Sequence, residues 1–431
     1  MMGSWTPISK CYVFIQHGGE YRPLGVLAES DAGFRFAYAQ SWLASPDAFS
    51  VDPLNLPLGT QEYKAARRCW GCFQDAGADN WGQRVLLATH RQAPANQIEW
   101  LISARGNGAG ALTFSASRTQ LPAIEQPPEL ALVSELMVEA ERLIEEGTVD
   151  QLAALPPHIH KALVYGSSMG GARPKFTVAH EGSEWICKLS RSDDTFNQPI
   201  AEMASLNMAV DCGLDVPRHQ LHRVGGKAML MVERFDRGVD GAKRHYLSGN
   251  SLINADRARD GDPEGAMSYI RLAEVITKVS NSPAADRREL FARMVLNVAI
   301  GNTDDHLKNH GFLHAGGERY TLAPVFDVLP HPKQTDLMAL SIGRSGREAS
   351  LVNALSMADR FGLSQNEAMA TVERVLGVTA NAGMYFSDAG ATMLESGLLH
   401  NIAHSKRMDY QQASADLVAR VAPGRGSAPG R

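Results

Sequence analysis

The chain opens with two short, mostly apolar segments that are typical of strands. These are residues 12–16 and 24–28, and Gly18-Gly19-Glu20 between them is typical of a tight turn. We therefore predict a β-hairpin near the N-terminus. Further along, the glycine-rich residues 106–110 lead into the apolar run 111–114. Because no helical pattern follows these glycines, a tight hairpin is favoured there over a phosphate-binding loop.

The middle of the chain changes to short strands that are interrupted by single helices. Pro122, Pro127 and Pro128 indicate a linker, and residues 130–144 then place apolar residues at helical spacing with acids on the other face. Residues 162–237 alternate short strands with one clear helix at 202–212. Gly213 is typical of a residue that closes a helix.

The C-terminal half has mostly helical spacing. The clearest predicted helices are residues 267–279, 286–299, 365–376 and 411–420. A strand-rich region followed by a helical one predicts two lobes with a cleft between them. The final residues, 423–431, are rich in Pro, Gly, Arg and Ser and are predicted to be disordered.

Composition narrows the class of protein. The 431 residues are 44% hydrophobic and 21% charged, which predicts a soluble globular protein of two or three domains. Lys and Arg number 42 and Asp and Glu 47, so the net charge is −5. This balance excludes nucleic-acid binding by bulk charge and leaves a local basic patch open.

The five cysteines do not form a disulfide framework. Cys69 and Cys72 make a CxxC without a second pair, so inert thiols in a reducing cytoplasm are favoured over a metal or redox role. We expect neither a signal peptide nor a membrane-spanning segment, because no apolar run has the required length. A cytoplasmic location follows.

Dense polar residues directly follow the apolar helix that ends near residue 300. Four residues separate Asp304 from Asn309, which is the spacing of a protein kinase catalytic loop. In such a loop the Asp accepts the substrate hydroxyl proton and the Asn holds Mg²⁺. Asp327 follows a predicted strand at 321–326 and offers a second hard oxygen ligand. Helix capping and turn formation would explain each residue singly, whereas the combination favours a kinase.

A metal-dependent phosphohydrolase is an alternative interpretation of the same segment. Asp305 and His306 form an HD pair, and His306 and His310 would share one face of a helix. Asn309 is a poor transition-metal ligand, however, and no second helical pair of His and Asp follows. This interpretation is therefore less favoured than the kinase.

A phosphate-binding side is predicted upstream. Residues 166–175 are rich in glycine, and Arg173 and Lys175 add positive charge, although Ala172-Arg173 stands where a Walker A loop needs Lys-Ser/Thr. In the strand 184–189, Lys188 lies on the face opposite Cys187 and could pair with Glu202 at the start of the next helix. A surface lysine that covers apolar residues with its stem is the alternative for Lys188.

A hinge between the lobes is predicted where the apolar strand at 229–232 ends. Glu233-Arg234-Phe235-Asp236 follows it, and its backbone groups could read the edge of an adenine base. An ordinary strand end is the alternative.

These segments together resemble the HipA family, the kinase toxins of bacterial HipA–HipB toxin–antitoxin systems. The matching segments include residues 168–175, 187–189, 202–217, 232–237, 302–309 and 326–329, with weaker matches at 25–27, 56–58, 79–82 and 108–111. The resemblance implies an α+β, two-lobed, protein-kinase-like fold. Its parts would be an N-terminal subdomain (1–117), a strand-rich N-terminal lobe with a glycine-rich Ser loop (118–240), an all-helical C-terminal lobe (241–422) and a disordered tail (423–431).

The resemblance also implies functional roles for single residues. Asp304 would be the catalytic base, Asn309 and Asp327 would bind Mg²⁺, and Ser168 would be autophosphorylated and so inactivate the kinase, with Ser167 adjacent as the other choice. ATP would be contacted by Gly170, Gly171, Ala172, Arg173, Pro174, Lys175, Lys188, Glu233, Arg234, Phe235, His306, Lys308 and Asn309.

The partners that the resemblance implies are proteins. They are a HipB-like helix-turn-helix antitoxin and a translation component as substrate, in the family an aminoacyl-tRNA synthetase, typically the glutamyl enzyme. The weak acidity of the chain means that operator DNA would be reached only through the antitoxin. A binding module for antitoxin and operator, with catalysis secondary, remains the second hypothesis.

Overall fold

The computed structural model of the chain describes residues 7–89, 93–122, 126–138, 173–191, 193–238, 241–254, 263–331 and 335–421. Several predicted features lie outside these ranges. They are Ser167, Ser168, Gly170, Gly171, Ala172, the tail at 423–431 and the part of the predicted helix 130–144 beyond residue 138.

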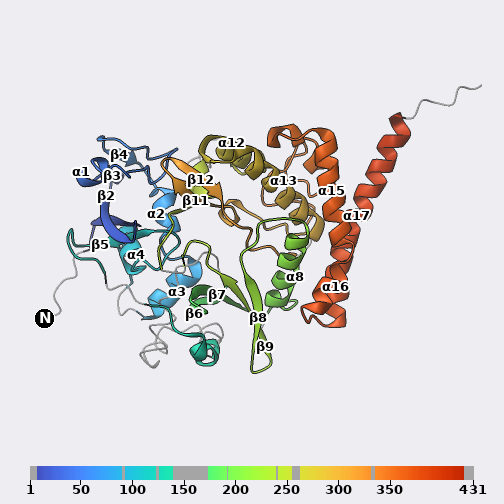
Figure 1. The fold of residues 1–431 in the computed structure, drawn as a ribbon, viewed down its shortest axis with the longest axis horizontal. Coiled ribbons are helices and arrows are strands. Elements are labelled where there is room, and N and C mark those ends of the chain that lie inside the picture. Colours follow the sequence, from blue (N-terminus) through green and yellow to red (C-terminus); the bar gives the residue numbers. More distant parts are fainter. Residues whose placement is uncertain are drawn as a thin grey trace, which may run out of the picture.

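The N-terminal domain is built on a five-stranded antiparallel sheet (Figure 1). Its strands lie in the order β4-β3-β2-β1-β5 and are β1 (Lys10–His17), β2 (Glu20–Ser30), β3 (Gly33–Tyr38), β4 (Tyr63–Ala65) and β5 (Leu112–Ser115). The predicted hairpin is confirmed: β1 and β2 pair, and Gly18 and Gly19 between them have φ of 61° and 82°. Residues with a side chain rarely adopt such angles, which explains the two glycines.

Four short helices connect these strands: α1 (Gln40–Leu43), α2 (Gly71–Asp75), α3 (Asn80–Thr89) and α4 (Gln97–Ser103). The predicted hairpin at residues 106–110 is wrong, because α4 precedes the glycines and β5 pairs with β1 instead. The glycines allow other parts of the backbone to lie very close to this segment. A Cβ at Gly108, for example, would lie 2.1 Å from the Ala76 carbonyl oxygen. The segment is therefore a packed connection against neighbouring backbone.

The small lobe is a four-stranded antiparallel sheet in the order β6-β7-β9-β8. It comprises β6 (Lys175–His180), β7 (Ser183–Leu189), β8 (His219–Val224) and β9 (Lys227–Glu233), with helix α8 (Gln198–Asp211) between β7 and β8. Leu206 of α8 packs against Leu230 and Val232 on one face. On the other face, Trp81 and Val85 of α3 join the apolar side chains of β6 and β7, so the N-terminal domain covers this sheet (Figure 1).

The C-terminal lobe is mostly helical. Its helices are α9 (Gly249–Ile253), α11 (Pro263–Ala266), α12 (Tyr269–Val279), α13 (Pro283–Ile300), α14 (Leu351–Leu355), α15 (Gln365–Thr379), α16 (Ala382–Asp388) and α17 (Met393–Val421). The four predicted helices are confirmed, although α17 begins well before residue 411. An entirely helical lobe is not observed, because β10 (Tyr246–Ser248), β11 (Gly311–Gly316) and β12 (Arg319–Leu322) form a three-stranded sheet.

The hydrophobic core joins the N-terminal domain to the C-terminal lobe. One cluster of buried side chains runs from β1 through Phe73 of α2 to the helices α12, α13 and α15. The small-lobe sheet has its own cluster around Phe176 and Cys187. Among the described residues, no helix is long and apolar enough to cross a membrane.

Candidate functional site

In the loop that follows α13, the neighbouring carboxylates of Asp304 and Asp305 point in different directions, one to solvent and one into the protein. Gly301, with φ of 71°, ends the helix. Asp305 then turns inward, where it accepts hydrogen bonds from the Tyr269 hydroxyl and, at 2.9 Å, from Nε2 of His310. Burial would raise the pKa of Asp305, but His310 and Tyr269 hold it below its usual value. Asp304 is exposed and has no hydrogen bond or ion pair with any described residue. Asp305 therefore anchors the loop, and Asp304 is left accessible.

The phosphohydrolase interpretation does not fit this geometry. Residues 307–309 form a single 3₁₀ turn, so His306 and His310 do not share an α-helical face. His310 is buried against Asp305 and Tyr269. Within the described ranges, no group of three or more His, Cys, Asp and Glu side chains could hold a metal ion.

Lys188 lies at the centre of a charged cluster in the cleft. Its Nζ is 2.6 Å from Oε1 of Glu202 and 3.0 Å from Oδ1 of Asp327. The predicted pair with Glu202 is therefore present, and the Lys188 side chain is only 20% exposed, unlike a surface lysine. Burial would lower the pKa of Lys188, but the two carboxylates raise it above its usual value. The cluster thus keeps a fixed cation beside Asp327.

Asp327 combines an unusual backbone with an accessible carboxylate. Its φ is 59°, in the left-handed region that Asp and Asn tolerate better than most residues, and the Asn302 amide donates to its carbonyl at 3.4 Å. The side chain is 45% exposed. Lys188 lowers the pKa of Asp327 to about 2, so the carboxylate is ionised at neutral pH.

The oxygen donors in the cleft fit Mg²⁺. Asn309 is 7% exposed, and its side-chain amide makes no hydrogen bond with any described residue, so its oxygen is uncommitted. Together with Asp327 it offers two hard oxygen ligands, and Mg²⁺ usually takes its remaining ligands from water and phosphate. His306 lies close enough to Asp327 to affect its pKa. Lys188 and His306 therefore both lie near Asp327.

The strand β6 brings a second lysine to the same side of the sheet. Lys175 stands directly opposite Lys188 in the β6–β7 register, so the two side chains share one face. The Lys175 side chain is 5% exposed and its Nζ lies 3.3 Å from Oδ2 of Asp79. Arg173, by contrast, binds both oxygens of Asp194 at 2.8 and 2.9 Å. The Pro174 carbonyl accepts from the Leu189 amide, so the base of the glycine-rich segment is held on β7.

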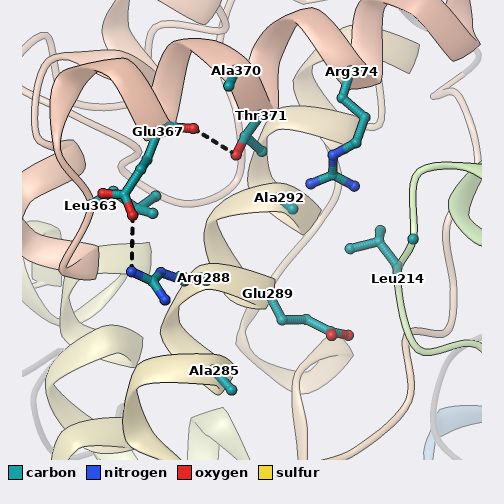
Figure 2. Close-up of a pocket in the computed structure, with 11 residues that line it drawn as sticks. Leu214, Ala285, Arg288, Glu289, Ala292, Leu363, Glu367, Ala370, Thr371 and Arg374 are labelled. Atoms are coloured by element: carbon teal, nitrogen blue, oxygen red, sulfur yellow. Dashed lines mark hydrogen bonds and ion pairs between the residues drawn. The ribbon is translucent and has the colours of Figure 1, made fainter.

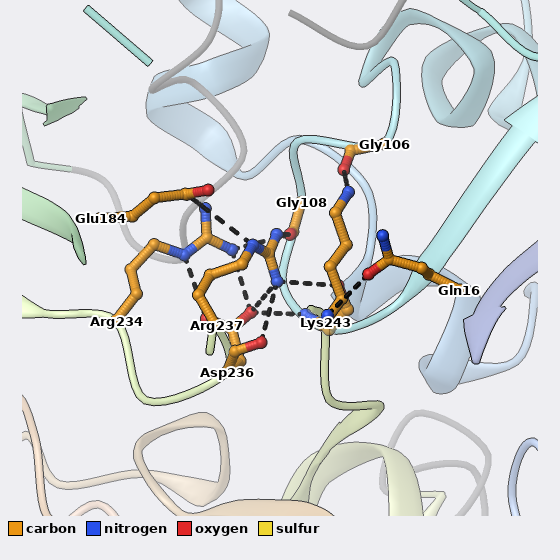
Figure 3. A network of polar contacts seen from close by, with 9 residues as sticks. Gln16, Gly106, Gly108, Glu184, Arg234, Asp236, Arg237 and Lys243 are labelled. Carbon is orange, nitrogen blue, oxygen red and sulfur yellow. Dashed lines mark hydrogen bonds and ion pairs between the residues drawn. The ribbon is translucent and has the colours of Figure 1, made fainter. Parts of the chain in front are cut away.

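The predicted hinge begins where β9 ends. Arg218 binds the Glu233 carboxylate, with one contact at 2.6 Å, and the Arg234 guanidinium is buried against Asp236 (Figure 3). The Glu233 and Arg234 side chains are therefore paired within the protein, and their backbone amides are also used, because they donate to the carbonyls of Arg218 and Glu184 at 2.8 Å. The Phe235 ring lies 5.5 Å from that of Phe326, the residue before Asp327.

A separate pocket lies on the C-terminal lobe and contains none of the predicted site residues (Figure 2). It is lined mainly by α13 and α15, with Gly213 and Leu214 at one side. At 1.5 Å per residue, the end of α8 at Asp211 is about 14 Å from Glu202, and Gly213 follows that end. The pocket is therefore distinct from the charged cleft.

Some residues of the cleft carried no predicted role. Asp79, Tyr269 and Asn302 hold Lys175, Asp305 and Asp327 in place. Asp79 lies in the segment 79–82, which resembles the HipA family only weakly, and Asn302 lies in the polar loop that contains Asp304. Tyr269 gave no signal, because a tyrosine at the start of an amphipathic helix is ordinarily a core residue.

Burial raises the pKa of the thiols of Cys69 and Cys72 well above the usual value. Both are free and buried in the N-terminal domain. This agrees with the interpretation of unreactive thiols, because the thiolate is the reactive form.

Comparisons with known proteins find relatives that are named as kinases. Curated relatives include "Putative kinase Y4mE" of Sinorhizobium fredii, 27% identical over 332 residues, which are 72% of this chain and 76% of the relative. The "Serine/threonine-protein kinase toxin HipA" of Shewanella oneidensis is 22% identical over 258 residues, covering 54% of this chain and 57% of that protein.

The fold is shared with a solved structure. The complex of HipA, HipB and operator DNA from Shewanella oneidensis MR-1 contains a chain that matches with a TM-score of 0.65 and 20% identity, over 91% of this chain and 95% of that one. The α+β, two-lobed, kinase-like fold is therefore confirmed. The family model of the HipA N-terminal domain matches residues 19–115, and that of the HipA-like C-terminal domain matches residues 167–382. Since these two models match most of the chain, it belongs to the HipA family.

Proposed function

We propose that this protein is an ATP-dependent serine/threonine protein kinase that acts as a HipA-like toxin. The observation that carries the proposal is the contact of Lys188 with both Glu202 and Asp327, beside the loop that holds Asp304 and Asn309. A fixed lysine, two oxygen ligands and an accessible carboxylate are the parts that phosphoryl transfer needs. Family membership supports the same activity.

Each part has a proposed role. Asp304 accepts the proton of the substrate hydroxyl, whose oxygen bonds to the γ-phosphorus of ATP as the bond to the β-phosphate oxygen breaks and ADP leaves. Lys188 and Lys175 neutralise phosphate charge. Asn309 and Asp327 would hold Mg²⁺, which when bound offsets the charge that develops on the phosphates. The phosphates would be lined by the glycine-rich residues Gly170, Gly171 and Ala172 and by Arg173, Pro174, His306 and Lys308. The hinge residues Glu233, Arg234 and Phe235 would contact adenine.

The regulation and partners that we propose follow the family. Ser168 would be autophosphorylated, which adds about −1.5 to −2 charges beside Arg173 and Lys175 and inactivates the kinase. The Shewanella structure contains HipA, HipB and operator DNA, which supports a HipB-like antitoxin as partner here. The net charge of −5 supports DNA contact through that antitoxin. The proposed substrate is a translation component, with an aminoacyl-tRNA synthetase as the family expectation, and the proposed location is the cytoplasm.

Radiolabelled ATP tests the proposal directly. The purified protein is incubated with γ-labelled ATP and Mg²⁺, beside Asp304→Asn, Ser168→Ala and Ser167→Ala. We expect label on the wild type, none on Asp304→Asn and none on Ser168→Ala, with Ser167→Ala labelled as the control. Wild-type protein that binds ATP and labels neither itself nor a cell extract would refute the kinase.

A further inference from the structure

We infer that Asp79 of the N-terminal domain is a positioning residue of the nucleotide site, because it holds Lys175 in place beside Lys188. The inference rests on the proposed kinase function and adds a part to it that lies outside both lobes. It means that the N-terminal domain takes part in binding the ATP phosphates.

The contact between Asp79 and Lys175 is buried on both sides. Nζ of Lys175 lies 3.3 Å from Oδ2 of Asp79, and the two side chains are 5% and 11% exposed. The start of α3 also holds the backbone of Lys175, since Nε1 of Trp81 donates to the Lys175 carbonyl oxygen at 2.8 Å. Residues 79–81 of the N-terminal domain therefore contact both the ammonium group and the backbone of Lys175.

Asp79 is itself fixed by the helix that it begins. Its Oδ1 accepts a hydrogen bond from the Gly82 amide at 2.6 Å, which is the contact of a helix N-cap. The cap uses one carboxylate oxygen and directs the other toward Lys175. Trp81 and Val85 then pack into the apolar face of the small-lobe sheet, so the carboxylate cannot move without the helix.

The charge balance of the cleft needs this carboxylate. Lys175 faces Lys188 across the β6–β7 pair, so two ammonium groups share one buried face. Glu202 and Asp327 both contact Lys188, and Asp79 is the carboxylate that contacts Lys175. Burial lowers the pKa of Lys175, and Asp79 opposes that shift. Loss of Asp79 would leave Lys175 with a weaker hold on its proton and on its position.

The same segment also contacts the C-terminal lobe. Asp75, at the end of α2, accepts hydrogen bonds from the Ser248 amide at 2.7 Å and from the Ser251 hydroxyl at 2.7 Å, at the start of α9. The next amide, that of Gly249, donates to the carbonyl of His310 at the end of the catalytic loop at 2.7 Å. Residues 75–81 therefore connect the phosphate side of the cleft with the loop that holds Asp304 and Asn309.

Two variants separate the proposed role from helix capping. Asn and Ser are both good N-caps, so Asp79→Asn and Asp79→Ser keep the start of α3 while removing the charge that faces Lys175. Asp47→Asn is the matched control, because Asp47 lies in the same domain, is 58% exposed and pairs only loosely with Arg22 at 3.7 Å. Lys175→Met and the double variant Asp79→Asn/Lys175→Met complete the cycle.

The readouts are the Kd of MgATP by calorimetric titration, and KM and kcat for phosphoryl transfer. We expect each Asp79 variant to raise Kd and KM for MgATP about tenfold, the typical worth of a charge-assisted hydrogen bond, with kcat changed less than about twofold. In the double variant the effects should not add, since both changes remove one contact. Asp47→Asn should match the wild type.

The outcomes distinguish this inference from the proposed function. If the wild type transfers phosphate and the Asp79 variants bind MgATP as tightly as it does, Asp79 has no positioning role and the kinase stands. Additive effects of Asp79→Asn and Lys175→Met would also overturn the inference. If the wild type binds MgATP tenfold more tightly than Asp79→Asn but transfers no phosphate, the inference holds and the kinase fails.

Discussion

Two clusters of charged residues, one around Lys188 and one around Asp236, differ in what surrounds them. In the cleft, Lys188 contacts Glu202 and Asp327, and the Asp327 side chain remains 45% exposed. At the hinge, Arg234 and Arg237 enclose Asp236, and all three side chains are almost completely buried (Figure 3). Both clusters combine cations with carboxylates, yet only the first leaves an ion within reach of a ligand.

The hinge cluster is closed by backbone of the N-terminal domain. The Gly108 carbonyl accepts from Arg234 at 3.0 Å and from Arg237 at 2.9 Å, and the Gly110 amide donates to Asp236 at 2.7 Å (Figure 3). A buried ion is costly unless such partners satisfy it. The comparison teaches that the hinge charges hold residues 108–110 of the N-terminal domain against residues 234–237. In the cleft, by contrast, the Asp327 carboxylate is still able to bind a further group.

Replacing Asp327 should have the largest effect on activity. Asp327→Asn keeps the shape and tolerates the left-handed backbone, but it removes the ionised ligand proposed for Mg²⁺. We expect kcat to fall by about a thousandfold or more, because several kcal/mol of charge stabilisation are lost. Lys188 keeps Glu202, so the free energy of unfolding should change by less than about 1 kcal/mol. Full activity in a steady-state ATP assay would remove Asp327 from the site.

Replacing Asp236 should have the opposite effect, with a large loss of stability. Asp236→Asn removes the carboxylate that two buried guanidinium groups share, which typically costs about 3–5 kcal/mol of stability. Urea unfolding measures this loss, and Asp193→Asn, at an exposed pair with Arg191, is the control that should stay within about 0.5 kcal/mol. A loss below 1 kcal/mol for Asp236→Asn would contradict the closed character of the cluster.

The same cluster has a defined acid response. Burial would raise the pKa of Asp236, but Arg234 and Arg237 hold it well below the usual value. A depressed carboxyl pKa stabilises the folded state above the unfolded pKa of about 4, and this contribution is lost as the pH falls below it. Asp236→Asn should therefore flatten the acid limb of the stability curve.

The sequence predicted the cleft better than the hinge, for a physical reason. Asp304, Asn309, Asp327 and Lys188 occur at spacings set by local elements, so a pattern of residue types is enough to find them. The Lys188–Glu202 contact also follows from strand alternation and the position of the next helix. The longer helices α8, α12, α13 and α15 were predicted from the pattern of apolar residues, as were strands such as β1, β2, β7 and β9, whereas the short helices α1 to α4 were not.

Long-range contacts explain what the sequence did not reveal. Glycines 106–110 resemble a turn locally, and their partners Arg234 and Arg237 are about 125 residues away, so nothing nearby indicates a carbonyl cradle. Asp79 likewise contacts Lys175, which lies 96 residues further along the chain. The strand β10 was missed because its three residues acquire their role only by pairing with β11.

Replacing Glu202 should reduce activity less than replacing Asp327. Glu202→Gln can still accept a hydrogen bond from Lys188, which also keeps Asp327, so the lysine shifts rather than loses its site. We expect kcat/KM to fall about ten- to a hundredfold through misplacement of the lysine. Glu373→Gln, at an exposed position of α15, serves as the control. A loss as large as that of Asp327→Asn would mean that the two carboxylates act as one unit.

Lys243 gives the smallest effect and tests whether the hinge cluster is as closed as its contacts indicate. Its Nζ donates to the Gly106 carbonyl at 2.6 Å, and burial, together with Arg237 and Arg234, lowers its pKa to about 7 (Figure 3). Between pH 7 and about 10 the unfolded chain then binds more protons than the folded one, so stability rises with pH, by at most about 1.4 kcal/mol per unit. Lys243→Met should remove this rise in urea titrations at pH 7, 8 and 9, whereas Lys227→Met, at the exposed first residue of β9, should keep it. Identical slopes in Lys243→Met and the wild type would show that Lys243 stays protonated in the fold, and that the hinge cluster is less closed than its contacts indicate.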